Sequence, residues 1–122
     1  MSKERLGAFM DAVIAIVMTI LVLELEKPAE ASLAAFWALR INFAAYALSF
    51  LWLAAMWTSL HNAWHVANTI CSRTIWLSIG LLFFSSLFPY ATSLVSTYFH
   101  SAVVQGFYGV VVIATTVMMI LI

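Results

Sequence analysis

The sequence predicts an all-α integral membrane protein, a polytopic bundle in which about four helices cross the bilayer. Hydrophobic residues make up 66% of the 122 residues and charged residues only 8%, whereas a soluble domain is about 45–50% apolar and about 25% charged. Four apolar stretches are each long enough to cross the hydrocarbon core, which takes about 20 helical residues. Strands with open edges are excluded there, because unpaired backbone groups are not tolerated in hydrocarbon.

The first two predicted helices cover residues 6–25 and 32–60. The first ends in a charged run at residues 24–28, and Ser32 is a suitable N-cap for the second. Arg40 lies about a third of the way along the second stretch. A charge at that depth is costly, so we expect Arg40 to extend outward or to be paired.

The other two predicted helices cover residues 69–94 and 102–122. Pro89 lies within the third stretch, and the fourth runs to the last residue in an apolar sequence. We expect a natural terminus to carry polar residues beyond the membrane, so the ending indicates a truncated form of a longer protein. Residues 1–122 are predicted to form a single transmembrane domain, without linkers or repeats.

Charges in the loops predict the orientation of the chain. Lys3 and Arg5 precede the first helix and Arg73 follows the second, whereas the loop after the first helix is rich in glutamate. Because cytoplasmic loops carry an excess of lysine and arginine, the pattern predicts a multi-pass protein of the cell membrane with a cytoplasmic N-terminus. Tryptophans near the two boundaries fit interfacial belts, and they are Trp37 on one side and Trp57, Trp64 and Trp76 on the other.

A cleaved signal peptide is the alternative interpretation of the N-terminus. Basic residues, an apolar run and the sequence at residues 29–31 have the order that signal peptides show. Asp11 directly before the apolar run, and Glu24 and Glu26 directly after it, disfavour this alternative.

An apolar stripe lies on one side of the first helix. At 100° per residue, Ile16, Ile20 and Leu23 share this stripe, with Ala12 and Thr19 beside it. Such a stripe is usually a packing surface. It is also what a pore wall requires, because rings of branched aliphatic side chains around an axis form a constriction that gates by dewetting. Periodicity alone favours packing.

Arg5 and Asp11 are charged groups at the mouth of this helix. They are six residues apart and therefore point to different sides, so each needs a partner elsewhere. By the predicted topology, one set of polar residues lies at the same end of the molecule: His61, Asn62, His65, Asn68 and Arg73. We expect Asp11 to join this set in a structural network that holds the first three helices together.

Other chemistry has weak support in the sequence. Asp11 with the histidines permits a small proton-coupled transporter, but the sequence offers no second carboxylate within a membrane segment to continue a relay. His61 and His65 are spaced to share a metal, yet no carboxylate or thiolate stands beside them, and Cys71 is the only cysteine. We expect no catalytic site, metal or cofactor, and no nucleic-acid partner.

Several motifs resemble the transmembrane protein 175 family of potassium channels. The most specific is Arg5-x-x-x-Phe9-x-Asp11 with the apolar run after it. Supporting matches are Tyr46-x-x-Ser49-Phe50, the Trp57–His61–His65 region and Phe88-Pro89-Tyr90-x-Thr92. The resemblance covers essentially the whole chain. The sequence departs from the family motif at Met10, where serine is usual, and bacterial family members have six helices where this chain has about four.

The resemblance implies a channel that conducts potassium passively, with weak selectivity over sodium, and that has no enzymatic activity. It implies a homo-oligomer, a tetramer in bacterial members, with potassium ions and the bilayer as partners. The first helix would line the pore, with Ile16 at the narrowest point, Ile20 and Leu23 as further hydrophobic rings, and Thr19 as a polar position near the constriction. Arg5, Phe9 and Asp11 would tie helices together at the cytoplasmic end.

Overall fold

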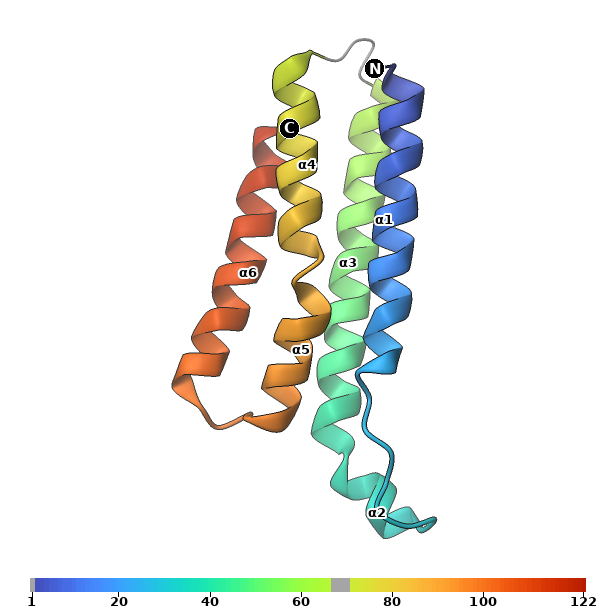
Figure 1. Cartoon of the computed structure of the whole chain (residues 1–122), viewed down its shortest axis with the longest axis vertical. Helices are drawn as coiled ribbons and strands as arrows, with labels where there is room; N and C mark the ends of the chain where they lie inside the picture. The colour runs from blue at the N-terminus through green and yellow to red at the C-terminus, as the bar shows by residue number, and fades with distance from the viewer. Residues whose placement is uncertain (1, 67–70) are drawn as a thin grey trace.

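Antiparallel helices form the described part of the computed structural model, which is residues 2–66 and 71–122 (Figure 1). The helices are α1 (Lys3–Leu23), α2 (Leu33–Ala38), α3 (Arg40–Val66), α4 (Ser72–Ser85), α5 (Phe88–Thr97) and α6 (Ala102–Leu121). Four spans are long and apolar enough to cross a membrane: α1, α3, α4 together with α5, and α6. The predicted membrane helix bundle with about four spans is confirmed.

Helix α1 begins three residues earlier than predicted because Ser2 caps it. The Ser2 hydroxyl accepts a hydrogen bond from the Arg5 backbone N–H at 3.1 Å, which satisfies one of the free donors of the first turn. The helix ends at Leu23, before the charged run. Its buried side chains recur every three or four residues and define one face: Leu6, Met10, Ile14, Val17 and Leu21.

The second predicted helix, 32–60, is divided into α2 and α3. Ser32 does act as an N-cap, accepting from the Ala35 backbone N–H at 3.2 Å, but α2 ends after six residues. At the division, the Arg40 guanidinium donates to the Trp37 carbonyl oxygen at 3.1 Å and lies over the Trp37 ring. Arg40 is therefore the first residue of α3, at the end of the span, rather than a third of the way along it.

The third predicted helix, 69–94, is also interrupted. α4 ends at Ser85 and α5 begins at Phe88, with Pro89 in the first turn of α5. Proline has no N–H, so the Ser85 carbonyl loses the partner that a continuous helix would give it. The Ser86 hydroxyl donates to the Phe83 carbonyl oxygen at 2.6 Å beside the break. A proline in the sequence thus marks a real separation of two half-helices.

The core lies where α1, α3, α4 and α5 meet. Its most buried side chains come from all four of these helices and include Leu21, Leu53, Leu81 and Phe88. α6 packs mainly against α4 and α5, and it buries only Val111 and Thr115. Because the buried side chains of α1 all lie on one face, α1 contacts the core along one side only, and its other side is left open.

The two ends of the bundle differ in charge. Figure 1 places the N-terminus, the beginning of α4 and the C-terminus toward one end, with α2 and the α5–α6 connection at the other. Of the ionisable side chains, the first end carries Lys3, Glu4, Arg5, Asp11, His61, His65 and Arg73, and the second carries Glu24, Glu26, Lys27, Glu30, Arg40 and His100, so the first end is the more basic of the two. This arrangement brings the beginning of α1, the end of α3 and the beginning of α4 to the same side, as the predicted topology requires.

Candidate functional site

The side of α1 that faces away from the core carries the predicted stripe. Ile16 is 58% exposed and Leu23 is 76% exposed, and Ile20 is 36% exposed at the edge of this surface. Ile14, two residues before Ile16, is only 2% exposed. The name open face is used below for the exposed residues Ala12, Ile16, Thr19, Ile20 and Leu23.

Thr19 is the polar residue of the open face. Its hydroxyl points back to its own helix and lies 3.1 Å from the Ala15 carbonyl oxygen and 2.9 Å from that of Ile16. One hydroxyl hydrogen is thus shared between two backbone acceptors. Thr19 Oγ1 keeps its lone pairs, which can accept a further hydrogen bond.

Asp11 lies at the border between the open face and α3. Its Oδ1 accepts a hydrogen bond from the Trp57 indole Nε1–H at 2.8 Å. The Trp57 ring stacks on His61 with centroids 5.4 Å apart, and His61 stacks on His65 at 6.4 Å. Asp11 is therefore connected to the two predicted histidines through an aromatic ladder along one side of α3.

Trp57 is the member of this ladder that sequence reasoning missed. A tryptophan at this position fits an interfacial belt, and that assignment does not predict a hydrogen-bond acceptor for its indole N–H. The available signal was the spacing, because Trp57, His61 and His65 recur every four residues and share one helix face.

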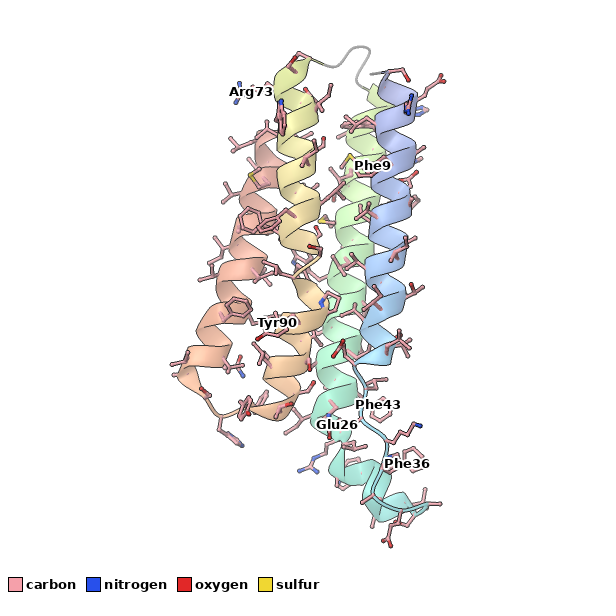
Figure 2. All side chains as sticks on the ribbon, viewed as in Figure 1. Phe9, Glu26, Phe36, Phe43, Arg73 and Tyr90 are labelled. Carbon is pink, nitrogen blue, oxygen red and sulfur yellow. The ribbon has the colours of Figure 1, made fainter. Side chains whose placement is uncertain are left out.

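The remaining predicted network residues lie elsewhere. Arg5 is exposed and lies on a different side of α1 from Asp11. Phe9 is half exposed and borders an apolar groove between α1 and α4. Arg73 is exposed in the first turn of α4, and Figure 2 shows its side chain extending away from α1. Asn68 lies outside the described residues.

A second contact between α1 and α3 lies about two helical turns closer to the N-terminus. The Trp64 indole Nε1–H donates to the Lys3 carbonyl oxygen at 3.4 Å. The ring passes so close to Gly7 that an added Cβ would lie 2.8 Å from Trp64 Nε1. Glycine at this position therefore allows α3 to approach α1 at its charged end.

Relatives in sequence support the same assignment as the motifs. The family model described as endosomal/lysosomal potassium channel TMEM175 matches residues 5–89. The chain is 37% identical over 97 residues to a potassium channel of Chryseobacterium sp. strain P1-3, covering 80% of this chain and 50% of that protein. It is 27% identical over 118 residues to a potassium channel of Streptomyces collinus, covering 90% and 57%. The chain spans about half the length of these curated relatives.

The fold matches a solved structure as well. A crystal structure of a lysosomal potassium-selective channel TMEM175 homolog from Chamaesiphon minutus superposes with a TM-score of 0.89 at 24% identity, covering 96% of this chain and 67% of that one. These relatives are named as channels and not as enzymes. The family model matches from Arg5 to Pro89, which covers nearly all of the first span, the second span and most of the third. The chain therefore belongs to the TMEM175 potassium channel family.

Proposed function

We propose that this chain forms part of a potassium channel in which several copies of α1 surround a passive cation pathway. The observation that carries the proposal is the open face of α1 in a chain whose relatives are named potassium channels. On this face Ile16 and Leu23 are more than half exposed, although the opposite face of the same helix is packed into the core. Potassium selectivity over sodium is proposed to be weak.

The chemistry of the open face fits a hydrophobic gate. Ile16 repeated around an axis would make the narrowest ring, with Ile20 and Leu23 as further rings. A narrow aliphatic ring excludes water when closed, so ions pass only in a wetted state. The Thr19 oxygen, beside Ile16, would replace part of the hydration shell of a passing cation. Since one chain contributes only one side of such a ring, conduction requires an oligomer, which we propose to be a tetramer.

Contacts at the charged end support a structural role for the motif residues. Asp11 binds Trp57 across the α1–α3 boundary, and Trp64 binds the Lys3 carbonyl about two turns away. These hydrogen bonds fix the position of α1 relative to α3 where the open face begins. We propose that Arg5, Phe9 and Asp11 shape this end rather than contact the ion.

Recording from the purified protein in planar bilayers tests the function. Under opposing potassium and sodium gradients we expect ohmic single-channel steps, with a reversal potential displaced toward that of potassium. The rival assignment, a proton-coupled transporter that uses Asp11 and the histidines, predicts saturable flux that depends on the pH gradient. Flux of that kind without unitary currents would contradict the channel proposal.

Cys71 offers a test of the proposed orientation in the cell membrane. The thiol is exposed just before α4, and a hydrogen bond from the Thr74 hydroxyl lowers the pKa of the thiol from its ordinary value. A lowered pKa raises the thiolate fraction at neutral pH, so maleimide labelling should be efficient. We expect a membrane-impermeant maleimide to label Cys71 only in inside-out vesicles. A Ser101→Cys variant lacking Cys71 should label from outside, and the reverse pattern would invert the topology.

A further inference from the structure

A buried cluster of three hydroxyl groups joins three helices, and the open face does not include it. Ser49 Oγ of α3 lies 2.7 Å from Thr92 Oγ1 of α5 and 2.7 Å from the Tyr108 hydroxyl oxygen of α6. Ser49 is completely buried and Thr92 is 2% exposed. The name hydroxyl cluster is used below for Ser49, Thr92 and Tyr108.

The hydroxyl cluster differs from hydroxyls such as that of Thr115 because its hydrogen bonds cross between helices. Ser85 of α4 also reaches another helix, but only through one long hydrogen bond to Met56 Sδ of α3 at 3.8 Å. Thr115 of α6 is equally buried, but it donates to the Val111 carbonyl of its own helix at 2.8 Å. A hydrogen bond to the same helix adds nothing to the placement of its neighbours. Two short hydrogen bonds between helices restrict how those helices are placed, because hydrogen bonds are directional and lose strength rapidly when the groups slide apart.

The half-helix α5 depends on these lateral contacts. The break before Pro89 removes a backbone hydrogen bond that would otherwise hold α5 in line with α4. At the break, the Phe88 ring stacks on Trp52 of α3 with centroids 5.0 Å apart, and it meets the Tyr108 ring edge-on at 6.0 Å. One turn further on, Thr92 binds Ser49. α5 is therefore fixed from the side by α3 and α6.

The opposite side of α5 lies against α1. Pro89 and Tyr90 border the same groove as Ile16, Val17 and Ile20 of α1, and the two helices pack together. Figure 2 labels Tyr90 on α5. α5 thus supports the segment of α1 that carries the proposed constriction, and a displacement of α5 would be transmitted to Ile16 and Ile20.

We propose that Ser49, Thr92 and Tyr108 are positioning residues for the constriction, holding α5 against α3 and α6 so that α5 sets the placement of α1 around the pore axis. The inference rests on the proposed function. Ion conduction then depends on hydroxyl groups that neither line the pore nor contact the ion.

Removing single oxygen atoms tests this role. Tyr108→Phe and Thr92→Val each delete a hydroxyl with little change of volume, and Thr92→Ser keeps the hydroxyl. The matched control is Thr115→Val, which deletes a buried hydroxyl of α6 bonded only to its own helix. Each protein is checked for assembly by size exclusion and for melting temperature, and single-channel conductance and potassium/sodium reversal potential are then recorded.

We expect Tyr108→Phe and Thr92→Val to assemble and to change the conductance at least severalfold or to shift the reversal potential. Thr92→Ser and Thr115→Val should match the parent in both readouts. The double variant Tyr108→Phe/Thr92→Val should differ little from either single variant, because both act through the Ser49 hydroxyl. If one single variant fails to assemble, the other decides the result.

Three outcomes would overturn the proposal. The first is unchanged permeation in the assembled hydroxyl-cluster variants, and the second is an equal change in Thr115→Val. The third is loss of assembly in both single variants, because the hydroxyls would then maintain the fold and not the constriction. Ile16→Asn separates this failure from failure of the proposed function: if it alters permeation while the cluster variants do not, only the present inference is wrong.

Discussion

The two faces of α1 have nearly the same chemistry but opposite surroundings. The buried face consists of Leu6, Met10, Ile14, Val17 and Leu21, and the open face of Ala12, Ile16, Thr19, Ile20 and Leu23. Both are apolar, so hydropathy does not separate them. What separates them is size and polarity, since the open face alone contains a hydroxyl, that of Thr19 between Ile16 and Ile20, and a small side chain, that of Ala12.

The difference teaches that an apolar membrane helix can serve two purposes at once. Large side chains fill the core on one side, while small and polar residues on the other allow close approach of neighbouring helices or water. Substitutions that exchange polarity between the faces should therefore fail in different ways. On the buried face they should affect folding, and on the open face they should affect permeation.

Ile14→Asn should produce the largest effect, which is loss of the folded protein. Truncating a buried large aliphatic side chain costs about 2–5 kcal/mol, and the amide adds the penalty of a buried polar group without a partner. Ile14 is 2% exposed in the core. Size exclusion and thermal melting should show little or no assembled protein, and normal melting would place Ile14 outside the core.

Ile16→Asn should leave assembly intact and raise the current severalfold. An amide in the proposed ring admits water and offers oxygen atoms to cations, so discrimination between potassium and sodium should also weaken or change. Conductance and reversal potential are compared with the parent at matched protein levels. If both are unchanged in an assembled protein, the first helix does not form the constriction.

Asp11→Asn should reduce assembly moderately and leave the reversal potential near that of the parent. The asparagine oxygen can still accept from the Trp57 indole, so the loss is that of a charge-assisted hydrogen bond becoming a neutral one, about 1–2 kcal/mol. Trp57→Phe, which removes the donor, is the matched variant. The measurement is oligomer yield beside reversal potential, and normal yield with a shifted reversal potential would make Asp11 part of the ion pathway.

Gly7→Ala should have the smallest effect, a lower melting temperature corresponding to about 1 kcal/mol or less. The new Cβ meets the Trp64 indole at 2.8 Å, so the ring must shift, and the better helix propensity of alanine offsets part of this loss by about 1 kcal/mol. Ala8→Gly, on the exposed side of α1, is the control and should lose only helix propensity. A melting temperature raised by Gly7→Ala would show that Trp64 moves freely.

Sequence predicted the spans well because bilayer thickness constrains length and hydropathy so strongly. The four membrane helices, the N-cap at Ser32 and the opposite orientation of Ile14 and Ile16 all follow from local rules. The interruptions of the second and third predicted helices do not. Pro89 is present in the sequence, but proline is tolerated within membrane helices. Its presence alone therefore does not distinguish a kinked helix from two separate helices.

Side-chain partners were harder to predict than helices. Asp11 was expected among histidines and arginine, but its hydrogen bond goes to Trp57. A helix rotation of a few tens of degrees decides which of several polar residues at one end is reached, and periodicity does not give that rotation. The hydroxyl cluster was missed for a similar reason, since Ser49, Thr92 and Tyr108 are far apart in sequence and meet only after packing.

The lengths of the helices have a consequence for the membrane itself. α1 has 21 residues and α3 has 27, so at 1.5 Å per residue they measure roughly 31 Å and 40 Å. The shorter helix matches a hydrocarbon core of about 30 Å, and the longer one exceeds it. Figure 1 shows the excess, with the beginning of α3 and α2 extending past the end of α1. A thicker bilayer would cover this extension and favour an upright α3, whereas a thinner one would tilt the bundle. We therefore expect lipid chain length to influence the angle between the bundle and the membrane normal.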